Sequence, residues 1–331
     1  MKIYELTQEN YSNAGYSDLV RLEPLPGQVA PIVERWKLDL MVAGIVSGSR
    51  LHVSGPTGTA KTLTIRSLVY RPSNFETICR ALGLPLLPLT VYSCQIGRFD
   101  GPSEIVFRRT ATKRGEIVDE DSILVKALKE QDGRRGQNYA VILLPELGRA
   151  LSEAIQGALV ELISPTVLLD SERRLLLVDH VCWLGDSNYA DTTGEYSLVK
   201  LDEALHRRLS IAVEMFHPGE EQECAILKTL VAESDPEELV RIVRLASDVR
   251  KARAERSLLS LPPPSLDGCA QFLKMRRMLP HVQVETLAFS TVLSSCAPAD
   301  RPKAGDMLAK IFGVTARSSG SEKGDDGVSQ L

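Results

Sequence analysis

Eight consecutive residues, from Gly55 to Thr62, have the types and spacing of a phosphate-binding loop. In such a loop, backbone N–H groups and the positive end of the following helix point at phosphate oxygens. Lys61 would reach the β- and γ-phosphates, and the Thr62 hydroxyl would ligate Mg²⁺. The alternative is a glycine-rich turn that binds nothing. We expect Mg²⁺ to be held by Thr62 and ATP to be held by the whole loop: Gly55, Pro56, Thr57, Gly58, Thr59, Ala60, Lys61 and Thr62.

The flanks of the loop fit this interpretation. Residues 50–54 form a short run typical of a buried strand, and residues 61–70 have a helical pattern. One residue departs from the motif, because Ala60 stands where glycine is expected. Alanine adds a single methyl group, so the turn is preserved on the condition that the local φ is negative.

A nucleotide site of this type also needs an acid at the end of a second strand. Residues 139–144 are an apolar run that leads into Pro145 and Glu146. The usual form ends in Asp-Glu, where the aspartate holds Mg²⁺ and the glutamate polarises the attacking water. Here Pro145 replaces the aspartate, so we expect weaker Mg²⁺ binding. Glu146 keeps the water-activating position at the carboxyl end of the strand; the alternative is a surface acid.

The elements that must position these residues alternate along the chain. Strands are expected at 50–54, 88–92, 140–144 and 180–184, and helices at 61–70, 122–130 and 151–163, which favours an α/β domain with a mostly parallel sheet. After residue 218 only helical patterns follow, among them a strong helix start at 234–238 and helices at 265–278 and 303–312. We expect an N-terminal lead-in at 1–36, a P-loop core at 37–217, a small all-helical domain at 218–313 and a disordered tail at 314–331.

Composition excludes several other classes. The chain has 331 residues, of which 44% are hydrophobic and 25% charged, which is incompatible with a mainly disordered chain or a fibre. With 39 Lys and Arg against 43 Asp and Glu, the net charge of −4 gives no overall attraction to DNA or anionic lipid. Six scattered cysteines indicate reduced thiols rather than zinc ligands. Without an apolar secretory segment or a membrane-spanning run, a cytoplasmic protein is expected.

The order of motifs over about residues 30–300 resembles the MoxR class of AAA+ ATPases, near the CbbQ, NorQ and GvpN types. GPTGTAKT at 55–62 is similar to that class's GPPGVAKT, and LLPELGRA at 143–150 is similar to LADEINRA. Residues 152–163 resemble the helix that follows, and 166–178 resemble a β-hairpin. The resemblance implies an AAA+ core followed by a helical lid.

The same resemblance implies roles for three further residues. Gly185-Asp-Ser-Asn188 is similar to ATQN, which makes Asn188 the first sensor that orients the lytic water. Residues 201–209 resemble L-x-x-A-L-x-x-R-F, so Arg208 matches the arginine finger, with Arg207 as its fallback. An arginine finger acts on the nucleotide of the next subunit, which implies a homo-oligomeric, hexameric ring. The alternatives are a turn asparagine and a solvated arginine pair.

Two regions concern the lid and the partner. A second-sensor arginine is absent where Asp267 stands, which leaves Arg276 and Arg277 as weak candidates. Between the first two motifs, a hairpin near 104–116 carries four basic residues: Arg108, Arg109, Lys113 and Arg114. We favour a solvated hairpin with salt bridges over a contact with nucleic acid or an acidic partner.

Three functions follow from these observations. The first is a ring-forming, chaperone-like ATPase that hydrolyses ATP, slowly if Pro145 weakens the metal site, and remodels a partner protein. The resemblance implies a partner with a von Willebrand factor A domain or a metalloenzyme being matured. The second is a nucleotide-gated assembly module with little or no hydrolysis, motivated by Pro145 and Asp267, in a defence or nucleic-acid-processing system. A nucleic-acid translocase is the third and least favoured.

Overall fold

The computed structural model describes residues 2–95, 101–111, 115–147, 153–163, 168–169, 175–176, 180–188, 202–255 and 263–313. The chain divides into two compact units, Met1–Ile226 and Leu227–Leu331. The tail expected at 314–331 lies outside the described residues. Among the helices in these ranges, none combines the length and the apolar character that a bilayer crossing requires.

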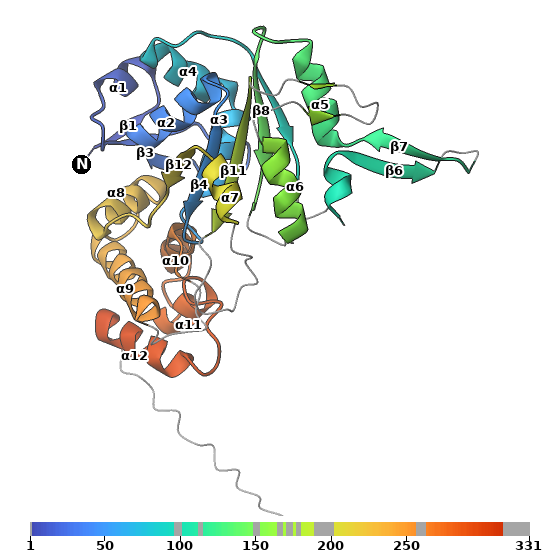
Figure 1. The fold of residues 1–331 in the computed structure, drawn as a ribbon. Helices are drawn as coiled ribbons and strands as arrows, with labels where there is room; N and C mark the ends of the chain where they lie inside the picture. Colours follow the sequence, from blue (N-terminus) through green and yellow to red (C-terminus); the bar gives the residue numbers. More distant parts are fainter. Residues whose placement is uncertain are drawn as a thin grey trace, which may run out of the picture. The chain divides into compact units, whose positions relative to one another are not determined.

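A five-stranded parallel sheet forms the centre of the first unit (Figure 1). Its strand order is β12 (Ile211–Glu214), β4 (Arg50–Gly55), β11 (Val181–Asn188), β8 (Tyr139–Leu144) and β5 (Leu89–Ser93). The α/β class with a parallel sheet is therefore confirmed, and all four expected strands are present. β12 was not expected, and β11 continues to Asn188, beyond the expected end at 184.

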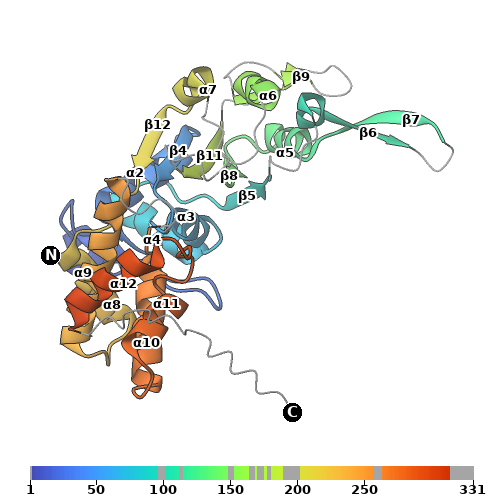
Figure 2. The same ribbon diagram turned by 90° about the horizontal axis from the view of Figure 1, so that it is seen from below.

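Helices cover both faces of this sheet (Figure 2). α2 (Arg35–Val46), α3 (Lys61–Val69) and α4 (Pro72–Leu82) pack on one face, and α5 (Ile123–Asp132), α6 (Glu153–Ile163) and α7 (Glu203–Arg208) pack on the other. The side chains of β8 are buried on both faces of the sheet. Val141 and Leu143 belong to the core under α2, α3 and α4, and Ala140, Ile142 and Leu144 belong to the core under α5, α6 and α7. A strand buried on both faces needs a continuous apolar run rather than an alternating one.

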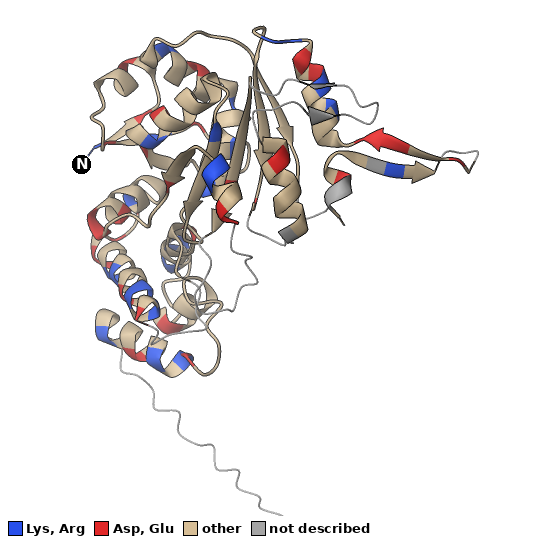
Figure 3. Cartoon of the chain, in the orientation of Figure 1, with Lys and Arg blue, Asp and Glu red and all other residues tan. Residues whose placement is uncertain are grey.

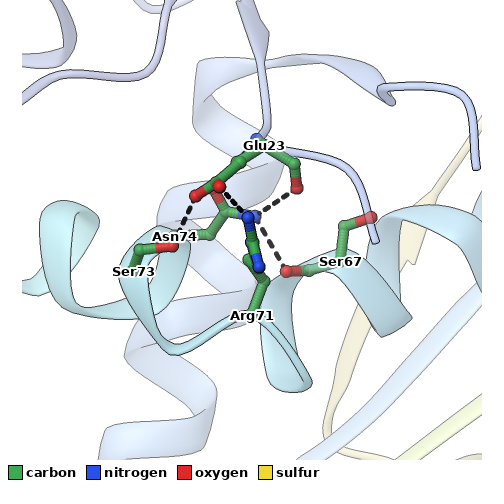
Figure 4. Close-up of polar contacts among 5 residues, drawn as sticks. All are labelled: Glu23, Ser67, Arg71, Ser73 and Asn74. Carbon is green, nitrogen blue, oxygen red and sulfur yellow. Dashed lines mark hydrogen bonds and ion pairs between the residues drawn. The ribbon is translucent and has the colours of Figure 1, made fainter. Parts of the chain in front are cut away.

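The N-terminal lead-in is folded into a small sheet of its own. β1 (Ile3–Glu5), β2 (Leu19–Arg21) and β3 (Ile32–Glu34) form three strands, with α1 (Gln8–Asn13) between the first two. The segment between β2 and β3 is bound to the start of α4 through Glu23 (Figure 4). The buried Asn74 side chain accepts from the Glu23 N–H at 3.0 Å and donates to its carbonyl at 2.8 Å. Arg71 and Ser73 bind the Glu23 carboxylate, so main chain and side chain are both held.

A hairpin of β6 (Phe107–Ala111) and β7 (Ile117–Asp121) projects from the first unit, preceded by a short helix, η2 (Pro102–Ile105). Acidic residues lie along β7 (Figure 3), and Arg109 pairs with Asp119 at 3.3 Å. This ion pair agrees with the salt-bridged hairpin that the sequence favoured; Lys113 and Arg114 lie outside the described residues. A second antiparallel pair consists of the short strands β9 (Leu168–Leu169) and β10 (Leu175–Leu176).

The described part of the second unit is helical, and α8 (Glu220–Leu230) spans the boundary between the units. α9 (Pro236–Ala254) begins where the sequence predicted, because the Asp235 side chain accepts the Glu237 N–H at 3.0 Å and Pro236 occupies the first turn. α10 (Leu266–Met278), α11 (Val284–Ser290) and α12 (Arg301–Phe312) follow. The apolar face of α9 is buried: Leu239, Ile242, Leu245, Ala246 and Val249.

Candidate functional site

The loop between β4 and α3 needs two of its glycines. Gly55 has a φ of +148°, and a Cβ atom there would lie 2.0 Å from the carbonyl oxygen of Met215. Gly58 has a φ of +84°. Only glycine adopts the first conformation while another backbone approaches so closely. The loop is therefore a tight turn at the carboxyl end of β4 that delivers the chain into the N-terminus of α3.

Ala60 has a left-handed backbone conformation, with a φ of 59°, at the N-cap of α3. We expected alanine to preserve the turn only if its φ is negative, and the φ of Ala60 is positive. A left-handed alanine costs about 1 kcal/mol because its Cβ crowds the following carbonyl oxygen. The turn forms in spite of this cost, with glycine at the two other positions of positive φ in the loop, Gly55 and Gly58.

Lys61 is 5% exposed and its amine folds back over its own loop. The Nζ atom donates to the carbonyl oxygens of Gly55 at 2.9 Å and Pro56 at 2.6 Å. Burial lowers the pKa of Lys61 to about 8, and the negative charge of Asp186 opposes this shift. All these hydrogen-bond acceptors are neutral. Phosphate oxygens would bind the ammonium more strongly, because charge-assisted hydrogen bonds are about twice as strong as neutral ones.

The structure adds a residue that the sequence interpretation missed. Asp186 lies on β11 and is 3% exposed. The Thr62 hydroxyl donates to one of its carboxylate oxygens, and the backbone N–H of Glu146 donates to the other at 3.0 Å. Its carbonyl oxygen also accepts the N–H of Leu147 at 2.6 Å. Asp186 thus joins the start of α3 to the chain that leaves β8.

Glu146 is exposed and has a φ of 55°. Together with Ala60 it is one of two residues other than glycine with positive φ in the described part of the chain. Such conformations cost about 1–3 kcal/mol and persist only where neighbouring contacts hold them. Here the hydrogen bond to Asp186 is one of those contacts. The side chain predicted to activate water is therefore displayed from a constrained turn directly after the buried Pro145.

Asn188 is the last residue of β11 and pairs in register with Gly55 of β4. It is half-buried, and by alternation along the strand it shares a face with Asp186 and with Leu184, which packs in the core beneath α3. The structure therefore brings five residues to one edge of the sheet: Lys61, Thr62, Glu146, Asp186 and Asn188. In parallel α/β sheets, ligands bind outside this carboxyl edge.

Arg207 and Arg208, the two candidates for the arginine finger, lie at the end of α7. α7 packs through Leu205 on the face covered by α5 and α6, opposite to α3. Arg207 pairs with Glu203, and the positive charge of Arg208 contributes, after burial, to a lowered pKa of Arg50. Both side chains are exposed and border an open pocket of about 570 Å³ with Asp202, Glu203 and Ala204. A single chain thus keeps Arg207 and Arg208 on the other face of the sheet from Lys61.

The second-sensor candidates belong to the second unit. Asp267 is exposed in the first turn of α10. Arg276 donates to Glu238 at 2.7 Å and to the carbonyl oxygens of Pro280 and Val282, while Arg277 pairs with Glu233. These contacts give Arg276 a structural role within its own helical unit.

The donors near the loop fit Mg²⁺ rather than a soft metal. No cluster of three or more His, Cys, Asp or Glu side chains that could hold a metal occurs in the described ranges. Mg²⁺ does not need such a cluster, because it binds through one or two carboxylates together with phosphate oxygens and water. The Thr62 hydroxyl and the Asp186 carboxylate are hard oxygen ligands of this kind, and they lie in contact. All six cysteines are free thiols.

Comparison with known proteins finds a similarity among solved structures. No protein-family model matches the chain, and no curated protein matches it. Among solved structures, it is similar to one from Cytophaga hutchinsonii ATCC 33406 described as a "putative ATPase". The two are 12% identical, the match covers 84% of this chain and 88% of the other, and the TM-score is 0.35.

Proposed function

We propose that this chain is a MoxR-like AAA+ ATPase that binds ATP with Mg²⁺, assembles into a ring and uses hydrolysis to remodel a partner protein. One observation carries the proposal: the loop at 55–62 turns through Gly55 into α3 beside the contact between Thr62 and Asp186. A phosphate-binding loop, a hydroxyl, a buried carboxylate and an exposed glutamate are the groups that phosphoryl transfer to water needs. All of them come from the carboxyl edge of one parallel sheet.

In the proposed mechanism, the N–H groups of the loop and the Lys61 ammonium bind the triphosphate. The Thr62 hydroxyl would hold Mg²⁺, which when bound neutralises charge on the phosphate oxygens. Glu146 accepts the proton of the attacking water, and Asn188 orients that water. Because these groups come from three strands and one helix, binding of the triphosphate would complete a site whose parts are already positioned.

Ring assembly is proposed from the position of α7. Arg207 and Arg208 are exposed on a helix that packs on the opposite face of the sheet from α3, which favours a role at another subunit's loop over a role at their own. A guanidinium at the nucleotide of the next subunit would stabilise charge on the transferring phosphoryl group. We propose a core at 37–217, a helical lid at 218–313, and a partner that carries a von Willebrand factor A domain or is a metalloenzyme. A role for nucleic acid is not favoured.

A second candidate is a nucleotide-gated assembly module with little turnover. It is supported by Pro145 at the end of β8 and by Asp267 at the position of the second-sensor arginine. Both replacements remove groups that would stabilise charge around the phosphates. In this case ATP would hold the ring together, and assembly itself would be the output.

Nucleotide binding is the experiment that tests both candidates. Binding of a fluorescent ATP analogue is measured for the native chain, for Lys61→Ala and for Lys126→Ala, a matched control on the exposed side of α5. We expect binding by the native chain and by Lys126→Ala, and loss by Lys61→Ala. Equal binding by all three, or none by the native chain, would overturn the proposal. Phosphate release by the native chain then separates the ATPase from the assembly module.

A further inference from the structure

We infer that Asp186, on β11, supplies the carboxylate of the Mg²⁺ site, in place of the aspartate that is missing at Pro145 after β8. This inference rests on the proposed nucleotide site. The acidic residue of the metal site would thus lie on β11 instead of at the end of the neighbouring strand β8. The position of Asp186 in the sheet, its contacts and its burial each support this assignment.

The sheet register puts Asp186 beside Pro145, the position at which the aspartate is missing. β11 pairs with β8 in parallel, with Leu184 opposite Leu143 and Gly185 opposite Leu144. One residue beyond this last pair, Asp186 follows on β11 and Pro145 follows on β8. Neighbouring strands lie about 4.8 Å apart, so a carboxylate on either strand reaches the same volume above the sheet edge.

Both positions also belong to the same face. Leu143 and Leu184 lie in the core that includes Ile65 and Leu68 of α3. Side chains two residues apart on a strand share a face, which directs Asp186 toward α3, as an aspartate at position 145 would be directed. The contact with Thr62, the second residue of α3, agrees with this direction.

The contact between Thr62 and Asp186 has the polarity that a cation requires. The threonine hydroxyl donates its proton to the carboxylate, because an ionised carboxylate can only accept. The hydroxyl oxygen therefore keeps its lone pairs for a metal ion. The second carboxylate oxygen binds the Glu146 N–H at 3.0 Å, so the same group would position both the metal and the turn that displays Glu146.

The charge balance around Asp186 favours a cation as well. Its side chain is almost fully buried, and its two described hydrogen-bond donors, a hydroxyl and a backbone N–H, are neutral. A buried carboxylate is costly unless an opposite charge compensates it. Lys61 supplies part of this charge, but its amine is engaged by the carbonyl oxygens of Gly55 and Pro56. A divalent cation delivered with a triphosphate would complete the balance.

The competing interpretation is that Asp186 only fastens the turn after β8 to α3. The two interpretations differ in one measurable quantity, the gain in nucleotide affinity produced by Mg²⁺. Affinity for a fluorescent ATP analogue is measured in Mg²⁺ and in EDTA for the native chain, Asp186→Asn and Asp119→Asn, a control acid on the exposed hairpin. Asparagine keeps the size of the side chain and one of its two acceptor oxygens, replaces the other oxygen with an NH₂ donor, and removes the charge.

We expect Asp186→Asn to lose about 10–100-fold of the gain that Mg²⁺ produces, taken as the ratio of the affinities of the same variant in Mg²⁺ and in EDTA. The control Asp119→Asn should keep that gain. An unchanged gain in a folded Asp186→Asn variant would overturn the inference while leaving the nucleotide site intact. Failure of the native chain to bind in EDTA as well as in Mg²⁺ would instead overturn the proposed function.

A second variant protects the test against misfolding. Pro145→Asp combined with Asp186→Asn moves the carboxylate back to β8, at the same level and on the same face. We expect this double variant to recover the Mg²⁺-dependent gain. A folded double variant that binds nucleotide without any gain from Mg²⁺ would contradict the placement of the metal between the two strands.

Discussion

The backbone N–H of Glu146 donates a hydrogen bond of 3.0 Å to the carboxylate of Asp186. Glu146 has a left-handed φ of 55°, and this bond is one of the contacts that hold it in that conformation. The two acids come from adjacent strands, β8 and β11, and each depends on the other's position. In the proposed site, the group that activates water is thus attached through its main chain to the group that holds the metal.

Replacement of Glu146 by glutamine should separate binding from hydrolysis. Glutamine keeps the size of the side chain and the backbone N–H that binds Asp186, but it cannot accept a proton from water. We expect phosphate release to fall by about 10²–10⁴-fold, the usual contribution of a general base, with unchanged nucleotide affinity. The control Glu76→Gln, on the exposed side of α4, should leave the rate unchanged. Equal rates for Glu146→Gln and the native chain would remove Glu146 from the mechanism.

Ala60→Gly should stabilise the loop. Glycine adopts a φ of 59° without the steric cost that alanine bears, although it also increases the entropy of the unfolded chain. The net effect should be a rise of up to about 1 kcal/mol in the free energy of unfolding. Ala158→Gly, within α6, should have the opposite sign, because glycine costs about 1 kcal/mol in a helix. Chemical denaturation of both variants measures the two changes, and a destabilised Ala60→Gly variant would contradict the strain assigned to this position.

The parts of the fold that the sequence predicted are those with a strong local pattern. The run at 139–144 is apolar at every position and forms the interior strand β8, and the cap and proline at 235–236 start α9. The short strands were missed for the same reason, because three residues such as those in β1 or β3 carry too little pattern. The left-handed φ of Ala60 is likewise invisible in the sequence, because alanine has no intrinsic preference for positive φ.

Asp186 could not be assigned from the sequence for a different reason. Its importance depends on β11 lying between β4 and β8, a pairing of segments more than forty residues apart. The segment 185–188 was interpreted through Asn188 alone. Residues 185–188 are Gly-Asp-Ser-Asn, and glycine, aspartate and asparagine are depleted in strands, so the local sequence does not indicate that β11 continues past position 184. Alternation along the observed strand puts Asp186 and Asn188 on one face. Only the order of strands shows that this face meets Thr62.

His52 should make the stability of the first unit depend on pH. Burial, and to a smaller extent the nearby His206, lowers the pKa of His52 to about 4. Because the unfolded chain has the ordinary pKa of 6.5, it binds the proton more readily than the folded chain between these values. The stabilisation is therefore complete above pH 6.5 and is lost as the pH falls toward 4, by about 3 kcal/mol in total.

The matched variant for this prediction is His52→Gln, which does not titrate. Its amide can keep the hydrogen bond that the Nε2 atom of His52 makes with Ser187 at 2.7 Å. Unfolding free energies of the two proteins, measured between pH 4 and pH 8, should diverge as the pH falls, with the native chain losing more. Parallel curves across this range would show that His52 is not held neutral by burial.

The position of Arg208 on the face opposite to α3 predicts complementation between two inactive variants. If Arg208 acts on the nucleotide of the next subunit, Arg208→Ala should lower phosphate release by about 10³–10⁵-fold. Arg207→Ala, which removes the side chain paired with Glu203, is the neighbouring control and should have a smaller effect. Mixing Arg208→Ala with Glu146→Gln creates interfaces where an intact Glu146 meets an intact Arg208, so activity should return in the mixture. If Arg208→Ala is inactive alone and stays inactive in every mixture, the arginine acts on the nucleotide of its own chain. If Arg208→Ala alone is fully active, Arg208 has no role in catalysis.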